Sequence, residues 1–255
     1  MDLGLQDKKV VILGGSRGIG RYAAEAFIDE GAHIAFCARG AEGVASAEKE
    51  MSGRSHAVRV FGQAVDLEDG DATRGFIRSA EEALGGIDVL IHNASGFGMA
   101  NNEQDWRRSF EVDIMAGVRA VDEALSALQA SGAGSIVFIG SMASKFHFGR
   151  PESPYGAAKA AIRAYANELA QNYGRDGIRA NVISPGAVWF PGGRWDERKK
   201  ASPEFYAQVE KGIPLGRLGT GEELARIIVF TASPAGLWLN ATHLAADGGQ
   251  VATVD

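Results

Sequence analysis

Tyr155 and Lys159 are the residues of this chain whose types and spacing could do chemistry. They stand four residues apart at the start of an alanine-rich segment, and positions i and i+4 lie on one face of an α-helix. On that face an ammonium can lower the pKa of a phenol, which makes tyrosine a usable acid or base near neutral pH. The same spacing is typical of a solvated surface pair, so it indicates acid/base chemistry only beside a binding site.

A glycine-rich turn near the N-terminus predicts such a site. The run Gly14-Gly15-Ser16-Arg17-Gly18-Ile19-Gly20 follows the first predicted strand directly and opens a predicted helix. Glycines let the backbone turn tightly and approach a pyrophosphate, and the helix N-terminus supplies N–H groups and partial positive charge. An ordinary strand-helix turn is the alternative, but the place of the run in the first βα unit favours nucleotide binding. The expected contacts are Gly14, Ser16, Arg17, Gly18, Ile19 and Gly20.

The residues after the second predicted strand indicate which dinucleotide is bound. An acid that holds the adenosine ribose of NAD would stand there, but the chain reads Phe36-Cys37-Ala38-Arg39. Arg39 and Arg17 offer two guanidinium groups for a 2'-phosphate, unless both are merely solvated. We therefore expect NADP(H) to be preferred over NAD(H).

The elements that must position these residues alternate along the chain. Apolar runs predict strands at residues 10–13, 33–37, 58–65, 89–91, 136–139, 180–183 and 243–246. Amphipathic or alanine-rich segments predict helices at residues 19–30, 41–51, 72–84, 106–128, 155–173 and 222–232. This order predicts an α/β fold over residues 1–255, a single-domain, doubly wound, parallel β-sheet of Rossmann type with helices on both faces. Residues 185–219 break the rhythm after a strand's carboxyl end, and we expect them to form a substrate lid.

Composition narrows the class of protein. The 255 residues are 45% hydrophobic, and the net charge of −6 argues against nucleic acid or an anionic membrane as a partner. Cys37 is the single cysteine, so the chain cannot form an internal disulfide. The histidines are scattered without metal-ligand spacing, and no metal is expected. The N-terminus lacks a signal-like pattern and no run of eighteen apolar residues occurs, so a cytoplasmic protein is expected.

Taken in order, these motifs resemble those of the short-chain dehydrogenase/reductase family over essentially the whole chain. The matching sites are Gly14-xxx-Gly18-x-Gly20, Asp66-Leu67, His92-Asn93-Ala94-Ser95-Gly96, Ser141, Tyr155, Lys159, Ile178-Arg179-Ala180-Asn181, Pro185-Gly186 and Asp247-Gly248-Gly249. The resemblance implies that Tyr155 donates a proton during carbonyl reduction and, as phenolate, is the base during oxidation. It also implies that Lys159 assists Tyr155 and holds the nicotinamide ribose, and that Ser141 holds the substrate oxygen. Further cofactor contacts are implied at Asp66, Leu67, Asn93, Ala94, Pro185 and Gly186.

One departure from the family pattern touches the chemistry. Asp113 stands where the family usually has an asparagine that feeds a water relay from the lysine. A carboxylate could anchor water as well, but its charge near Lys159 could alter the pKa of Tyr155. We expect a competent catalytic site and leave the relay role of Asp113 open.

Aromatic residues dominate the segments expected above the nicotinamide. They are Phe97, Phe146, Phe148, Trp189, Phe190, Trp195, Phe205 and Tyr206. They could form a pocket for a bulky apolar or aromatic ketone, with Phe97, His147, Trp189 and Trp195 as substrate contacts, or pack the lid and the subunits. For His147, a plain loop role is favoured over a second acid/base role.

Two other functions fit the same motifs. A 3-oxoacyl thioester reductase would use Arg107-Arg108 or Arg198-Lys199-Lys200 against an acidic acyl-carrier protein. A non-catalytic NADP-binding regulator is the second alternative, although the intact Ser141, Tyr155 and Lys159 argue against it. The resemblance further implies a homotetramer built through the predicted helices at residues 106–128 and 155–173.

Overall fold

A seven-stranded parallel sheet forms the centre of the molecule. The computed structural model describes residues 2–148 and 151–252. The strand order is β3-β2-β1-β4-β5-β6-β9, and every neighbouring pair is parallel. The strands are β1 (Lys9–Leu13), β2 (His33–Ala38), β3 (Val60–Ala64), β4 (Val89–His92), β5 (Ser135–Ile139), β6 (Arg179–Pro185) and β9 (His243–Ala246).

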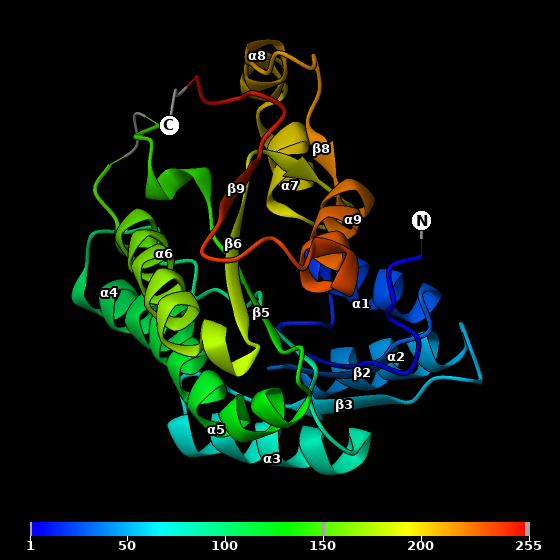
Figure 1. Cartoon of the computed structure of the whole chain (residues 1–255). Helices are drawn as coiled ribbons and strands as arrows, with labels where there is room; N and C mark the ends of the chain where they lie inside the picture. The colour runs from blue at the N-terminus through cyan, green and yellow to red at the C-terminus, as the bar shows by residue number, and fades with distance from the viewer. Residues whose placement is uncertain (1, 149–150, 253–255) are drawn as a thin grey trace.

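Helices cover both faces of this sheet, which confirms the predicted fold class. The long helices are α1 (Gly18–Asp29), α2 (Ala41–Ser52), α3 (Gly70–Leu84), α5 (Ala116–Ala130), α6 (Pro154–Tyr173) and α9 (Gly221–Ala232). In Figure 1, α5 and α6 lie on one side of the sheet, and α1 and α9 lie on the other. Val11 and Leu13 of β1 pack into one core cluster while Val10 and Ile12 pack into the other. Because strand side chains alternate between faces and both faces are buried, residues 10–13 of β1 form an unbroken apolar run.

The predicted helix at residues 106–128 proves to be three segments in series. They are α4 (Glu103–Ser109), a π-helical turn (Phe110–Met115) and α5. Ser109 and Ala116, which flank the turn, keep right-handed helical dihedral angles, so the axis continues through it. A π-helical turn is wound more widely than an α-helix, with i→i+5 hydrogen bonds. The spacing of apolar residues in the sequence does not reveal this local change in winding.

The segment at residues 185–219 is folded rather than a long open loop. It contains β7 (Val188–Trp189), α7 (Arg194–Ala201) and α8 (Pro203–Gly212), and it ends at β8 (Gly219–Thr220). β7 and β8 pair in parallel and close the base of the excursion. A small cluster of Ala187, Tyr206, Ile213 and Leu218 fills its interior. In Figure 1, α7 and α8 lie at the end of the molecule toward which β6 runs.

Short 3-10 turns complete the fold at Met142–Ser144, Gly174–Asp176 and Pro234–Gly236. Among the helices of residues 2–148 and 151–252, none is long and apolar enough to cross a membrane.

Candidate active site

Lys159 is the buried centre of the candidate site. It lies in the second turn of α6 with only 2% of its surface exposed. Its Nζ donates a hydrogen bond to the carbonyl oxygen of Ile139, the last residue of β5, at 3.0 Å. The same Nζ lies 6.0 Å from the centroid of the Tyr155 ring, and Tyr155 is only partly buried. The predicted shared helix face therefore exists, with the cation inside and the phenol at the surface.

Asp113 provides the charge that opposes Lys159. It lies within the π-helical turn and is fully buried. Its Oδ1 lies 3.0 Å from Lys159 Nζ, and its Oδ2 accepts a hydrogen bond from the backbone N–H of Gly96 at 3.0 Å. Only Oδ2 is hydrogen-bonded, whereas Oδ1 meets the ammonium at ion-pair distance without hydrogen-bond geometry.

His92 supports the same turn from β4. It is 2% exposed, and its Nε2 lies 3.1 Å from the backbone oxygen of Asp113. Burial, and secondly the charge of Lys159, lower the pKa of His92 to about 4. The ring is therefore neutral near pH 7, and Nε2–H donates to the carbonyl of Asp113. The sequence shows a scattered histidine here and gives no signal for this contact.

Ser141 reaches the site through a short turn. It follows β5 and begins the 3-10 turn Met142–Ser144, where its Oγ accepts a hydrogen bond from the N–H of Ala143 at 3.1 Å. A Cβ placed on Gly156 would lie 2.8 Å from the oxygen of Ala143. The turn therefore packs directly on the first turn of α6, which brings Ser141 to the end of the helix that carries Tyr155.

The glycine turn has the shape of an anion cradle. Gly14 and Gly18 adopt positive φ angles of 86° and 60°, and a Cβ on Gly20 would collide with the oxygen of Gly14. Asn93 Nδ2 donates to that same oxygen at 2.7 Å. Within the described chain, no side chain caps the N-terminus of α1 and no acidic residue lies in its first turn. Ser16 and Ile19 are partly buried in the same turn.

Arg17 and Arg39 lie at neighbouring strand ends. The N–H groups of Gly14 and Gly15 donate to the oxygen of Cys37 at 2.9 and 3.1 Å, which joins the glycine turn to the end of β2. Both arginines are exposed, and neither makes a hydrogen bond or ion pair with any residue in 2–148 or 151–252. By contrast, Arg21 in the same helix pairs with Glu25 at 2.6 Å.

The other expected cofactor residues also follow strand ends. Asp66 is exposed and Leu67 is buried just after β3, and Asn93 and Ala94 follow β4. Pro185 ends β6, and Gly186 donates its N–H to the oxygen of Ala246 at 3.1 Å. All of these positions lie at the carboxyl edge of the sheet, where open α/β folds bind ligands.

The expected substrate residues divide into two groups. Phe97 is 48% exposed, has a positive φ of 48°, and stacks on Tyr155 with centroids 6.1 Å apart and planes 9° apart. The guanidinium of Arg194 also lies over the Phe97 ring, with its Cζ 5.4 Å from the ring centroid. Trp195 instead stacks on Phe205 at 6.3 Å, and Trp189 packs on the cluster inside the excursion. His147 is exposed.

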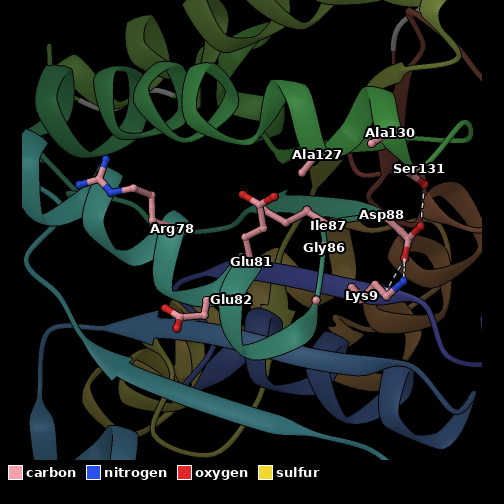
Figure 2. Close-up of a pocket in the computed structure, with 11 residues that line it drawn as sticks. Lys9, Arg78, Glu81, Glu82, Gly86, Ile87, Asp88, Ala127, Ala130 and Ser131 are labelled. Atoms are coloured by element: carbon pink, nitrogen blue, oxygen red, sulfur yellow. Dashed lines mark hydrogen bonds and ion pairs between the residues drawn. The ribbon is translucent and has the colours of Figure 1, made fainter.

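A cleft of about 620 Å³ lies at the opposite edge of the sheet (Figure 2). Lys9 at the start of β1 and Asp88 just before β4 line it. Asp88 accepts hydrogen bonds from the N–H of Lys9 at 2.8 Å and from Ser131 Oγ at 2.6 Å. These partners satisfy the carboxylate of Asp88, which indicates that Asp88 makes a structural contact. None of the expected site residues lines this cleft.

Comparison with known proteins defines the class. Residues 14–250 match the family model described as enoyl-(acyl carrier protein) reductase. The chain is 35% identical to isoepoxydon dehydrogenase patN of Penicillium expansum over 250 residues, which cover 96% of this chain and 95% of that protein. Its fold is similar to that of L-sorbose reductase from Gluconobacter frateurii complexed with NADPH and L-sorbose, with a TM-score of 0.89, 28% identity and full coverage of both chains. An NADPH-bound short-chain oxidoreductase of Pseudomonas aeruginosa gives a TM-score of 0.88 at 29% identity over 98% of this chain and 99% of that one.

The chain therefore belongs to the short-chain dehydrogenase/reductase family. It is an oxidoreductase of the type that acts on CH–OH and C=O groups.

Proposed function

We propose that this protein is an NADP(H)-dependent oxidoreductase that interconverts a carbonyl and a secondary alcohol, with Ser141, Tyr155 and Lys159 at the reaction centre. One observation carries the proposal. The buried ammonium of Lys159 is held by Ile139 and Asp113 on the helix face that presents the partly exposed phenol of Tyr155. An acid/base tyrosine needs such a fixed cation beside it and access to a substrate on its other side.

The glycine turn, α1 and the strand ends at Asn93, Ala94, Pro185 and Gly186 are the groups that would hold the dinucleotide. The bound nicotinamide cofactor supplies or accepts the hydride. Tyr155 donates the proton to the carbonyl oxygen in reduction and removes it from the alcohol in oxidation. The hydroxyl of Ser141 donates a hydrogen bond to the same oxygen and stabilises the charge that develops there.

Arg17 and Arg39 support NADP(H) over NAD(H). Two exposed guanidinium groups without partners in the described chain lie where the adenosine ribose would end, and no carboxylate stands at the end of β2. A 2'-phosphate would pair with both groups, whereas the ribose hydroxyls of NAD would gain no acceptor there. The NADPH complexes of the Gluconobacter and Pseudomonas proteins agree with this preference.

A bulky apolar or aromatic carbonyl compound is the proposed substrate. The Phe97 ring, stacked on Tyr155, would form one wall beside the reacting carbonyl, with Arg194 next to it. Trp189 and Trp195 are weaker candidates because they pack inside the excursion at residues 185–219, which we propose to act as the lid. The L-sorbose reductase acts on a sugar, so polar ketones belong among the compounds tested.

A panel of carbonyl compounds tested with NADPH and with NADH is the direct experiment. The panel holds aromatic ketones, small polar ketones and a 3-oxoacyl thioester, and the absorbance of the reduced nicotinamide reports turnover. We expect NADPH to be oxidised with at least one aromatic or cyclic ketone, and NADH to bind more weakly than NADPH in direct titration. Turnover of the thioester alone would instead favour the acyl-carrier reductase, and NADPH binding without any turnover would favour the regulator.

A further inference from the structure

The ring of Phe97 is held at the surface by a constrained piece of backbone. Phe97 is 48% exposed and has a positive φ of 48°, a region that costs free energy for a residue with a side chain. The N–H groups of Gly96 and Gly98, on either side of it, are bound by buried side chains. The first donates to Asp113 Oδ2 at 3.0 Å, and the second donates to Ser109 Oγ at 3.2 Å. Strained residues that their surroundings hold in this way cluster at ligand sites.

Two side chains from distant parts of the sequence contact this ring. The ring of Tyr155, on α6, stacks on it with centroids 6.1 Å apart and planes 9° apart. The guanidinium of Arg194, the first residue of α7, lies over it with Cζ 5.4 Å from the centroid. Because both groups contact the same ring, the guanidinium lies one ring away from the proposed proton donor.

The N–H groups of Arg194 have no acceptor in the described chain. The guanidinium makes no hydrogen bond or ion pair with any described residue, although Glu197 stands three residues further along the same helix. The carboxylate of Asp196, also on this helix, is engaged by Lys200 Nζ at 2.7 Å. Among the described residues, Arg194 is therefore a cation beside the proposed reaction centre without a counter-charge.

A guanidinium in this setting matches a carboxylate. Its planar fork presents two parallel N–H groups to the two oxygens of a carboxylate, and it can do so while one face rests on an aromatic ring. The ring keeps water away from that face, which strengthens the attraction between the two charges.

We propose that Arg194 is a specificity-determining residue that binds a carboxylate of the substrate, while the apolar body of the substrate lies against Phe97 and its carbonyl lies at Tyr155. The substrate class is then a ketone, or the matching secondary alcohol, that also bears a carboxylate. This assignment rests on the proposed oxidoreductase function, but the carboxylate site itself can be measured by binding alone.

The test compares 3- and 4-acetylbenzoate with their methyl esters. Each acid and its ester share the aromatic ketone and differ in charge. The ratio of kcat/KM for the acid to that for the ester is measured with NADPH. We expect this ratio to fall about tenfold in Arg194→Gln for at least one isomer, because a charge-assisted pair is lost. In the wild type the ratio should also fall as salt is added, since salt screens a partly exposed ion pair.

Binding gives a second measurement that needs no turnover. The same acids and esters are titrated calorimetrically into the NADPH complex of Tyr155→Phe, which lacks the proton donor. Adding Arg194→Gln to this variant should weaken binding of the acid about tenfold and leave binding of the ester within about twofold.

Arg198→Gln is the matched control. Arg198 lies on the same helix, but its guanidinium lies over Trp195, with Cζ 4.9 Å from the ring centroid. Its substitution should leave the acid-to-ester ratio unchanged. Arg194→Lys keeps the charge without the planar fork, and its ratio should fall between those of the wild type and Arg194→Gln.

Equal acid-to-ester ratios in the wild type and Arg194→Gln, in turnover and in binding, would overturn the proposal. A loss of NADPH affinity in Arg194→Gln would also overturn it, because the guanidinium would then serve a phosphate of the cofactor. If no ketone of the panel is reduced but the acids still bind through Arg194, the proposed activity fails and the carboxylate site stands.

Discussion

The ammonium of Lys159 is the buried cation of the candidate site. It is bound by a carboxylate and a backbone oxygen, and it is almost fully buried. A buried charge without partners is strongly disfavoured, so these two contacts offset the cost of burying the ammonium. The sequence pattern identified Tyr155, Lys159 and Asp113 as neighbours through the family resemblance. It could not reveal the direct ion pair, because that distance depends on how the helix is wound at residues 110–115.

His92 predicts a pH dependence of stability. Burial lowers its pKa in the folded protein to about 4 from the ordinary value of 6.5. The unfolded chain therefore binds the proton first as pH falls. The contribution of the neutral His92 to the free energy of unfolding is fully present above about pH 6.5. It is lost progressively as the pH falls to about 4.

We expect the free energy of unfolding, measured in urea, to fall by about 2 kcal/mol between pH 7 and pH 5 through this group. His92→Gln keeps a donor and should lose that part of the pH dependence. His56→Gln, at an exposed histidine, is the control and should behave like the wild type. Parallel profiles for the wild type and His92→Gln would contradict the expectation.

At the scale of elements, the strands and helices followed from the sequence but two features did not. Short apolar runs predicted each strand of the central sheet to within a few residues. Parallel strands that are buried on both faces consist almost entirely of apolar residues, so they are easy to recognise in the sequence. The π-helical turn and the folded excursion at residues 185–219 were not predicted. The turn changes the winding without changing the apolar pattern, and the excursion is held by tertiary contacts among Trp195, Phe205 and Tyr206.

Substitution of Arg179, which binds the end of α9, should lower the stability of the fold strongly. Its guanidinium donates to the backbone oxygens of Thr231, Ala232, Ser233 and Leu239. The residue is 7% exposed. Arg179→Met would leave these buried acceptors without their donor and should lower the free energy of unfolding by about 3 kcal/mol.

Urea unfolding measures this change, with Arg175→Met at an exposed arginine as the control that should stay near the wild type. NADPH affinity should be retained by both variants because Arg179 lies away from the glycine turn. A loss below about 1 kcal/mol for Arg179→Met would show that water replaces the guanidinium.

The excursion at residues 185–219 predicts a cooperative lid movement. The β7 and β8 pair ties its base, and the internal cluster joins α7 to α8, so we expect both helices to move as one unit. Hydrogen exchange should slow together across α7 and α8 when NADPH and a substrate analogue are bound. Equal exchange in the free and bound protein would mean that the segment is fixed structure.

At the scale of the whole molecule, the homotetramer stays a prediction, and exposed apolar residues lie on the helices expected to form it. Trp106 is 43% exposed on α4, and Phe110 is 53% exposed on the π-helical turn. Ala157, Ala161 and Ala164 are exposed along α6. Small residues on one helix and aromatic residues on the neighbouring one allow close packing between copies.

Light scattering at micromolar concentration should therefore give four times the mass of one chain. Phe110→Glu should reduce that mass, because a carboxylate would be buried in the interface. NADPH binding by this variant checks that each copy remains folded. A clean monomer for the wild type would contradict the expectation.

The central claim is that Tyr155 transfers the proton beside a hydride site. Its most direct test compares kcat and NADPH affinity of the wild type and Tyr155→Phe, using a carbonyl substrate from the panel. Removing one hydroxyl should lower kcat by about 10²–10⁴-fold and leave the dissociation constant of NADPH within about threefold, since positioned acid catalysis contributes this much and the ring remains in place. Retention of more than a few per cent of wild-type kcat would contradict the account.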